Sequence, residues 1–470
     1  MVETREKTVA VAAVDQFRST LRGDLIGPAD AEYEEARMVF NGMIDRHPSL
    51  IVRCADVADV IHAVDFARDN NLVLSVRGGG HNVAGFGTNE DGLVIDVSRM
   101  KGIRVDPEKR TVRAEGGATW GDLDHATDPF GLHAPGGVIS TTGIAGLSLG
   151  GGVGHLTRKA GLSCDNMLSA DVVTAAGKLV HASADENQDL YWALRGGGGN
   201  FGIVTSFEFR LTPVSTVFAG PVLFSLDQAR DVMRFYRQFM AGAPDDLNAF
   251  FAYLIVPPGP HFPQELHNKT VCGVVICYAG PMDKAEEVTR PLREFGPPLL
   301  DGVGPMPFSA LQSAFDPLMP PGLQNYWKAD FFDDLNDEAI EAHLKYGPEI
   351  PTVNSAVHLY PVSGAAGRVG KNDSAWSYRE ARFTLVIAAV YPDPADTEKN
   401  VRWVRDYWEA LHPHSAGGAY VNFMMDEGQE RIVASYRDNY QRLVDVKKKY
   451  DPSNLFRMNQ NISPNGARAQ

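Results

Sequence analysis

Apolar and polar positions near the start of the chain form two short apolar runs separated by an amphipathic stretch. Residues 51–53 and 72–74 are the apolar runs, and residues 56–68 carry apolar side chains every three or four positions. This spacing is typical of a helix with one buried face, whereas short apolar runs are typical of buried strands. The pattern predicts a strand–helix–strand unit that ends just before a glycine-rich segment.

Short alternating segments follow this unit. They predict a small mixed sheet from residues 92–96, 103–105 and 111–114, a hairpin over 171–181 that turns at Ala176-Gly177, and a strand at 203–211. Residues 213–221, which begin and end with proline, are a candidate domain boundary.

The second half alternates helical and strand patterns and has no glycine-rich loops. It predicts helices at 226–241, 283–294, 336–346, 395–411 and 427–447, and strands at 248–256, 271–279, 324–332, 352–360 and 382–391. The mixture predicts an α+β fold.

Glycine clusters are concentrated in the first half of the chain. Three glycines at 78–80 follow a predicted strand and precede His81, and similar clusters occupy 136–154 and 196–202. Consecutive backbone N–H groups in such a turn can bind a phosphate, and a neighbouring neutral histidine is a nucleophile and a proton carrier. One such loop is equally typical of a turn with a surface histidine, but several loops suggest a long, flat ligand enclosed from several sides.

Residues 197–202 match the glycine spacing of a dinucleotide-binding fingerprint. The match follows a helical pattern and precedes a strand, which is the reverse of the order in a Rossmann turn. We therefore do not expect a Rossmann NAD site.

The glycine segments together resemble those of FAD-linked oxidases with the vanillyl-alcohol oxidase fold. The similar motifs are Arg-Gly-Gly-Gly-His at 77–81, Gly-Ile-Ala-Gly at 143–146, the glycines of 150–154, Arg-Lys-Ala-Gly-Leu at 158–162 with Asp165-Asn166, and the segment 189–202. The closing segment Lys-Tyr-Asp-Pro-Ser-Asn-Leu-Phe-Arg at 449–457, followed by Asn459-Gln460-Asn461, resembles the berberine bridge enzyme-like branch. The resemblance covers about residues 45–463.

The resemblance implies that the chain is divided into three parts. They are a PCMH-type, two-subdomain FAD-binding domain at residues 1–213, an α+β substrate-binding domain with a large antiparallel sheet at 214–414, and a C-terminal segment at 415–470 that returns to the FAD-binding domain.

His81 is at the position that the family joins to the 8α-methyl carbon of the flavin, so an 8α-histidyl link to FAD is expected; the alternative is a loop histidine that only binds phosphate. Many relatives add a cysteinyl link, but residues 138–143 contain no cysteine, so no second link is expected. Cys164 is expected to line the flavin as a small apolar residue.

The other expected cofactor contacts come from the same motifs and from the end of the chain. They are Arg77, Gly78, Gly79, Gly80, Asn82, Ser140, Thr141, Thr142, Gly143, Gly146, Gly150, Gly154, His155, Asp165, Asn166, Ile203, Val204, Asn459 and Asn461.

Catalysis would require a group that takes a proton from a substrate O–H or N–H while hydride passes to flavin N5. Lys328 resembles a residue near the flavin in bacterial hydroxynicotine oxidases, and the alternative is an exposed strand lysine. Tyr360, Tyr391, Tyr420 and Asn422 are further candidates. The glutamate base of the plant enzymes has no match.

Composition argues against several other classes of function. A net charge of −15 and a pI near 5.3 argue against binding to nucleic acid or to an anionic membrane. Four scattered cysteines and an N-terminus without an apolar signal core favour a reduced, cytoplasmic protein, and His133 and His155 lack partners at metal-ligand spacing, so no metal site is expected.

The sequence thus predicts an FAD-dependent oxidase that acts on a carbinol, amine or sugar hydroxyl of a small molecule and uses O2 as its electron acceptor. Three alternatives remain: an FAD-dependent dehydrogenase with another acceptor, a non-catalytic flavin-binding protein, and an unrelated sugar- or phosphate-binding module. The substrate and the oligomeric state stay open.

Overall fold

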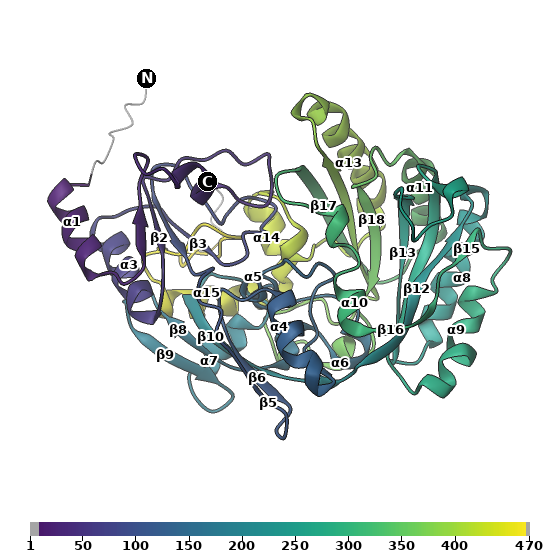
Figure 1. Ribbon diagram of the computed structural model, residues 1–470, viewed down its shortest axis with the longest axis horizontal. Coiled ribbons are helices and arrows are strands. Elements are labelled where there is room, and N and C mark those ends of the chain that lie inside the picture. Colours follow the sequence, from purple (N-terminus) through teal and green to yellow (C-terminus); the bar gives the residue numbers. More distant parts are fainter. Residues whose placement is uncertain (1–8, 467–470) are drawn as a thin grey trace.

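The computed structural model describes residues 9–466, and Figure 1 shows its two sides joined by a central group of helices and loops. The N-terminal side starts with a four-stranded sheet in the order β1 (Asp24–Ile26), β2 (Leu50–Arg53), β4 (Leu93–Asp96), β3 (Leu74–Arg77). Both β2 and β3 run parallel to β4. Helix α3 (Val57–Asp69) connects β2 to β3, which confirms the predicted strand–helix–strand unit.

Helix α3 begins where the sequence supplies a cap. The Asp56 side chain accepts hydrogen bonds from the N–H groups of Ala58 and Asp59, which have no partner within the helix. Val60 and Val64 lie on the buried face of the helix, in the core beneath the sheet. The apolar spacing and the cap together explain why this segment is helical.

A second sheet is antiparallel and five-stranded. Its order is β5 (Ile103–Asp106), β6 (Thr111–Glu115), β10 (Ile203–Arg210), β8 (Met167–Val173), β9 (Leu179–Ser183). The predicted hairpin is confirmed, with Gly177 at a φ of 70° in its turn. The predicted single sheet from residues 92–114 is wrong: β4 is buried along its whole length between two parallel neighbours, whereas β5 and β6 join the second sheet.

The third sheet has eight strands and is antiparallel throughout. Seven strands lie in the order β15 (Leu300–Asp301), β12 (Thr216–Phe224), β14 (Thr270–Tyr278), β13 (Leu247–Ile255), β18 (Ala356–Pro361), β19 (Phe383–Tyr391), β17 (Gln324–Phe332), and β16 (Gly304–Pro307) pairs with β12. This large sheet and the two smaller ones confirm the expected fold class.

Strand β12 was not among the strands predicted from the sequence. The segment 213–221 contains most of this strand, and Pro221 lies within it. A proline lacks the N–H that a central ladder needs, but the neighbours of β12 on one side are only the short strands β15 and β16, and the Pro221 carbonyl accepts a hydrogen bond from the N–H of Gly302. The strand therefore continues through the proline.

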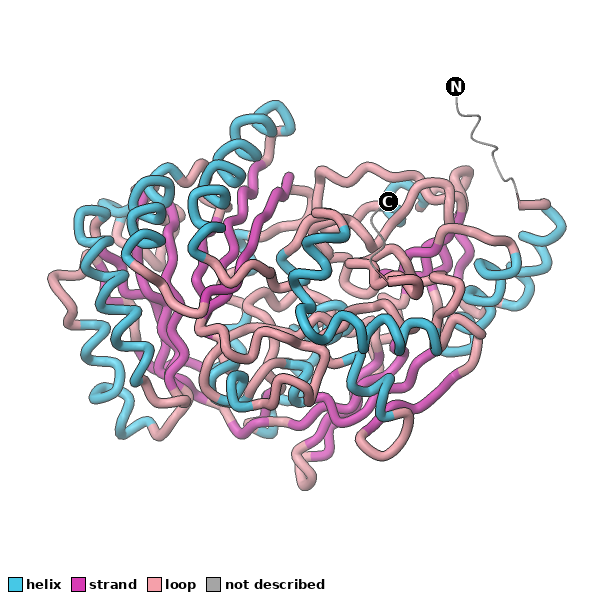
Figure 2. Tube along the Cα trace, turned by 180° about the vertical axis from the view of Figure 1, so that it is seen from behind, coloured by secondary structure: helices cyan, strands magenta, loops and turns pink. Residues whose placement is uncertain are grey.

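The two faces of the large sheet have different environments. Helices α8 (Ala229–Gly242), α9 (Ala285–Arg293), α11 (Asp337–Tyr346) and α13 (Thr397–Leu411) cover one face, as Figures 1 and 2 show. Tyr236, Tyr253 and Tyr407 pack together in that layer. Because side chains alternate along a strand, every second residue faces the other way, toward the glycine loops. No helix within residues 9–466 is both long and apolar enough to cross a membrane.

The last helices return to the N-terminal side. Helices α14 (Gln429–Tyr436) and α15 (Tyr440–Tyr450) replace the single helix predicted at 427–447, because the chain turns at Arg437, whose φ is 45°. In the core, Leu443 of α15 packs with Leu190 of α7 (Gln188–Leu194).

A fully buried ion pair fixes the end of α15. Lys447 Nζ donates to Asp451 Oδ2 (2.7 Å) and to the carbonyl oxygens of Asn200 (2.8 Å) and Phe456 (2.9 Å). The Asp451 carboxylate accepts hydrogen bonds from the N–H groups of Leu455 and Phe456, both at 2.8 Å. This network connects the third glycine cluster to the closing segment of the chain.

Replacing the buried lysine tests this network. In Lys447→Met the Asp451 carboxylate stays buried without its cation, so we expect the free energy of unfolding to fall by about 3–5 kcal/mol. Denaturant unfolding followed by tryptophan fluorescence measures the change. Lys448→Met is the matched control: Lys448 lies on the exposed side of the same helix, 3.5 Å from Asp445, and its loss should cost less than about 1 kcal/mol. Equal stability of the two variants would contradict the assignment.

Candidate functional site

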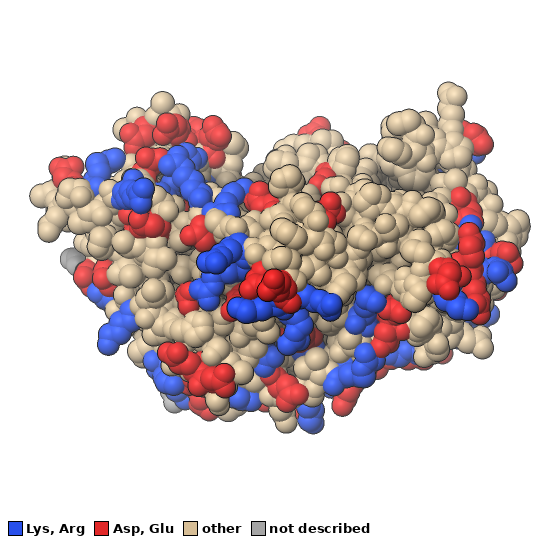
Figure 3. Space-filling model, turned by 60° about the horizontal axis from the view of Figure 1, so that its bottom comes forward, with Lys and Arg blue, Asp and Glu red and all other residues tan. Residues whose placement is uncertain are grey.

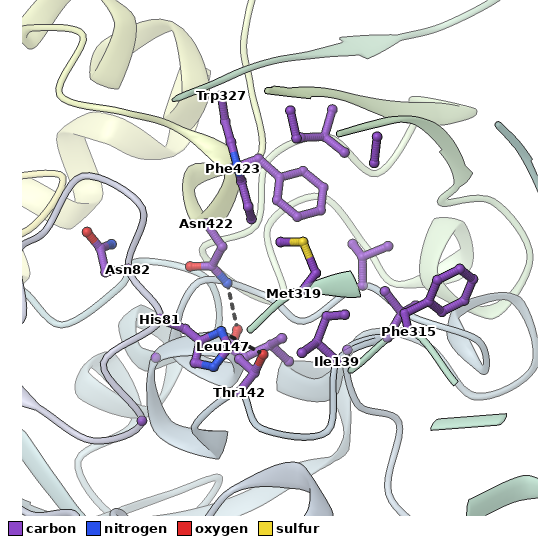
Figure 4. Close-up of a pocket in the computed structure, with 18 of the residues that line it drawn as sticks. His81, Asn82, Ile139, Thr142, Leu147, Phe315, Met319, Trp327, Asn422 and Phe423 are labelled. Atoms are coloured by element: carbon purple, nitrogen blue, oxygen red, sulfur yellow. Dashed lines mark hydrogen bonds between the residues drawn. The ribbon is translucent and has the colours of Figure 1, made fainter. Parts of the chain in front are cut away.

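A cavity of about 660 Å³ lies between the glycine loops and the open face of the large sheet. One wall consists of residues 77–82, 142–143, 145–147, 149, 198–200, 202–204, 456 and 458–460. The opposite wall consists of β13, β14, β18 and β19 with the loop that contains Phe315 and Met319. In Figure 4, His81 and Thr142 lie together at one end of the view, and Phe315 lies at the other.

Two glycine segments cross in direct backbone contact at the base of the cavity. A Cβ atom on Gly79 would lie 2.4 Å from the backbone nitrogen of Gly143, and one on Gly143 would lie 2.5 Å from the nitrogen of Gly79. Only glycine permits this approach at either position. The first two glycine clusters of the sequence therefore form one continuous wall.

Arg77 precedes this crossing and lines the cavity, but its charge is already paired. Its guanidinium lies 2.6 Å from the Asp96 carboxylate, at the directly opposite position of the neighbouring strand β4. It also donates to the carbonyl oxygen of Met38 at 3.2 Å. Any phosphate at this loop would thus be bound mainly by backbone N–H groups.

His81 projects from the loop with its imidazole held between three side chains. It stacks on Phe40 with 4.1 Å between ring centroids, and Nε2 and Nδ1 lie 3.1 Å and 3.4 Å from the hydroxyls of Thr141 and Thr142. Burial lowers the pKa of the imidazole to about 4. At neutral pH the ring is therefore uncharged, and one of its two nitrogens is unprotonated.

The cavity has the features of a site for a flat ligand with polar edges. Beyond its own neighbours in the chain, a Cβ atom on Gly146 or Gly199 would meet no atom of the described residues within 4 Å. Both glycines line the cavity, so side chains there would enter the ligand's space. Asn459 donates from Nδ2 to the carbonyl of Phe456 at 2.9 Å, while its buried Oδ1 has no hydrogen-bond partner among residues 9–466. Such an acceptor suits the N–H edge of a flavin.

The cofactor residues predicted from sequence divide into two groups. Those that line the cavity are Arg77, Gly78, Gly79, Gly80, His81, Asn82, Thr142, Gly143, Gly146, Ile203, Val204 and Asn459. Those that the structure places outside the lining are Ser140, Thr141, Gly150, Gly154, His155, Cys164, Asp165, Asn166 and Asn461.

Several residues of the second group support the wall from behind. The Ser140 N–H donates to Asp316 at 2.8 Å, and Thr141 contacts His81. Asp165 forms a paired contact with the Arg379 guanidinium at 2.7 Å and 2.8 Å. These partners are far away in sequence, so the spacing of the motif alone does not distinguish a wall residue from its support.

The candidate catalytic residues also divide into those that line the cavity and those that do not. Tyr360, Tyr420 and Asn422 line the cavity, whereas Lys328 and Tyr391 do not. Lys328 points to the opposite side of β17 from Trp327, which does line the cavity, and its Nζ lies 2.6 Å from the Glu427 carboxylate. The Tyr391 hydroxyl donates to Thr397 at 3.2 Å.

The hydroxyl of Tyr420 already has two donors. It accepts hydrogen bonds from the Gly152 N–H (2.9 Å) and from Asn422 Nδ2 (2.7 Å), and Asn422 also donates to the Leu147 carbonyl at 3.0 Å (Figure 4). These bonds fix the loop around the second glycine cluster. The geometry gives Tyr420 a holding role at the cavity wall.

His358 is a cavity residue that the sequence analysis did not include. Its Nδ1 lies 2.7 Å from Oη of Tyr360, two residues further along β18. The signal was available, since residues two apart on a strand share a face. A histidine two positions before a candidate tyrosine could therefore have been considered with it.

Two family models match the chain: "FAD binding domain" over residues 48–183 and "Berberine and berberine like" over residues 419–463. An uncharacterized FAD-linked oxidoreductase of Bacillus subtilis is 32% identical over 95% of this chain and 98% of its own length. The (R)-6-hydroxynicotine oxidase of Paenarthrobacter nicotinovorans is 31% identical, also over 95% and 98%. The crystal structure of 6-hydroxy-D-nicotine oxidase from Arthrobacter nicotinovorans matches with a TM-score of 0.85 and 28% identity over 97% of this chain and all of that one.

Sequence, fold and cavity agree, because the matched segments contain the glycine wall, His81 and the closing segment. The chain therefore belongs to the berberine bridge enzyme-like family of FAD-linked oxidoreductases.

Proposed function

We propose that this FAD-dependent oxidoreductase is an oxidase with FAD covalently attached to His81. The observation that carries the proposal is the neutral imidazole on the cavity wall, directly after the glycine loop. Its substrate is a carbinol, amine or sugar hydroxyl of a small molecule; FAD held in the cavity would supply the hydride acceptor, at N5, and the route for two electrons to O2. The name of the (R)-6-hydroxynicotine oxidase supports O2 as the acceptor.

The chain provides three kinds of contact for the cofactor. Backbone N–H groups of Gly78–Gly80 suit the pyrophosphate, the open surfaces at Gly146 and Gly199 suit a flat ring system, and Asn459 offers an unpaired oxygen. Arg77 contributes little charge there, because Asp96 neutralises it.

Attachment through His81 requires an unprotonated ring nitrogen. Attachment would join a ring nitrogen of His81 to the 8α carbon; the imidazole and the methyl group would each lose one hydrogen, and O2 would take up both as H2O2. The low pKa of His81 keeps the nitrogen nucleophilic at neutral pH, and the two threonine hydroxyls orient the ring.

We propose a single link. Cys164 is fully buried outside the cavity lining, and burial raises the pKa of its thiol, so it is a poor nucleophile.

Denaturing mass spectrometry tests the link. The wild-type chain should carry the mass of one FAD after denaturation, and His81→Ala should have the unmodified mass because the attacking nitrogen is gone. Cys164→Ala is the control and should keep the adduct. A wild-type chain without bound FAD mass, purified after growth with riboflavin, would refute covalent attachment.

A side chain at Gly146 should exclude the cofactor. Gly146→Leu places four carbon atoms in the open cavity, so we expect flavin content to fall by about tenfold or more in the purified protein, as measured by absorbance. Gly242→Leu is matched: Gly242 ends helix α8, also has no atom within 4 Å of its Cβ position, and lies outside the cavity lining. Equal flavin content in the two variants would argue against the ring lying there.

Oxygen use separates the oxidase from the alternatives. With a substrate that bleaches the flavin under argon, we expect one H2O2 for each carbonyl formed when air is admitted. Product formation that needs ferricyanide or a quinone would identify a dehydrogenase. A flavin that no substrate bleaches, although light and EDTA reduce it, would identify a binding protein.

A further inference from the structure

The half of the cavity next to the large sheet contains almost no charge. Among the described residues that line the whole cavity there is no Asp, Glu or Lys, and the one arginine, Arg77, belongs to the glycine wall and is paired with Asp96. The sheet side presents Ala252, Val275, Val386 and Ala388 from four positions of β13, β14 and β19. A charged ligand would lose its hydration there and gain no counter-ion.

Aromatic rings line this half of the cavity or, as with the fully buried Phe250, pack behind its lining. Phe250 lies 4.7 Å from Tyr360 and 4.9 Å from His358, Phe315 lies 6.1 Å from His358, and Phe423 lies 6.0 Å from Tyr360, all between ring centroids. Phe315 and Phe423 line the cavity and flank it in Figure 4. Aromatic walls favour flat, apolar ligands.

Polar side chains are few in this wall, and two of them, His358 and Tyr360, are hydrogen-bonded to each other. Both side chains lie on the inner face of β18 and line the cavity, and their hydrogen bond measures 2.7 Å. The hydroxyl of Tyr420, by contrast, is occupied by Gly152 and Asn422. A substrate hydroxyl that enters this half can therefore contact the Tyr360 hydroxyl, which is already hydrogen-bonded to a proton acceptor, Nδ1 of His358.

His358 is neutral at neutral pH, so it can accept a proton from Tyr360. Burial lowers its pKa to about 4 and raises the pKa of the Tyr360 phenol, so at neutral pH the phenol is protonated and donates to a neutral imidazole. The other titratable group near it is His155, whose pKa burial lowers to about 3. The neighbouring residues of β13 and β19, Phe250, Ala252 and Val386, and the loop residue Phe315 do not titrate.

We propose that this half of the cavity binds an uncharged, largely apolar carbinol, and that Tyr360 takes the proton of its hydroxyl while passing its own proton to Nδ1 of His358. The proposal rests on the proposed function, since it concerns the substrate of the same flavin. Tyr360 is then a catalytic residue, and His358 acts through it.

The step balances in atoms and electrons. The carbinol carbon loses a hydride to the flavin, its oxygen loses a proton to Tyr360, and the product is a carbonyl compound. His358 gains the proton and releases it when O2 takes up two electrons and two protons to form H2O2. A proton shuttle of this kind typically contributes about 10²–10⁴-fold to a rate.

The same features disfavour two other substrate classes. A sugar would place hydroxyl groups against the apolar side chains of β13, β14 and β19 and the rings of Phe315 and Phe423, where they would have no partners. An ammonium group would need a carboxylate that the described cavity lining does not contain.

Binding of an oxidised product analogue tests the subsite without turnover. We expect the holoenzyme to bind 2-naphthaldehyde at least about tenfold more tightly than 6-formyl-2-naphthoate in calorimetry, because the second compound adds only a carboxylate. Equal or tighter binding of the carboxylate would overturn the subsite. This measurement does not depend on covalent attachment or on reaction with O2, so it can fail or succeed independently of the proposed function.

Flavin bleaching by 2-naphthalenemethanol under argon tests the relay. Tyr360→Phe and His358→Gln should slow bleaching by about 100-fold or more at neutral pH, with unchanged flavin content. In His358→Gln the proton must leave to water, so the rate should rise with pH, whereas the wild-type rate should stay flat above about pH 5.5, where His358 is neutral.

Tyr236→Phe is the matched control for a lost buried phenol. Tyr236 lies on the helix-covered face of the same sheet and donates to the Ala249 carbonyl at 2.9 Å, so bleaching should keep its wild-type rate and its flat pH profile. Wild-type rates in Tyr360→Phe, or a flat profile in His358→Gln, would overturn the relay.

Discussion

The backbone contact between Gly79 and Gly143 is the constraint on which the site depends. It brings the loop after β3 against the loop before α5 (Ile144–Leu149), so segments more than 60 residues apart in sequence form one surface. Any side chain at either position would separate them. His81 then stands directly above the crossing, where Thr141 and Thr142 of the second segment reach its two ring nitrogens. The position of the imidazole thus follows from the absence of two Cβ atoms.

The large sheet has two roles: one face packs in a hydrophobic core with the helices, and the other face forms a wall of the cavity. Strand alternation sends Tyr253, Leu359 and Ile387 into the helix layer, while their neighbours face the cavity. The helix layer therefore stabilises the sheet independently of whatever the cavity holds. Residues on the inner face are therefore not required for the core of the sheet and can contact a ligand. On β18 two such residues, His358 and Tyr360, are hydrogen-bonded to each other.

Local chemistry explains how much of this fold and site was predictable. The periodicity of α3 and the turn at Gly177 are encoded within a few residues, and the sequence predicted both the helix and the hairpin. The membership of β4 in a parallel sheet was not predictable in this way, because a short apolar run carries no information about its partners. Strand β12 was missed for the opposite reason: Pro221 is a local signal for a break, and the tertiary contact with Gly302 overrides it.

The same distinction applies to the site. The glycine motifs identified the wall that contains His81, since close backbone approach requires glycine itself. Lys328 illustrates the limit: its place on β17 was predicted correctly, but the direction of its side chain depends on which face of the strand meets the cavity. Glu427 and Trp408, both distant in sequence, hold its ammonium group on the other side. Lys328 is thus turned away, Arg77 is neutralised by Asp96, and burial keeps His81 and His358 uncharged, so a charged substrate group beside them would have no counter-ion.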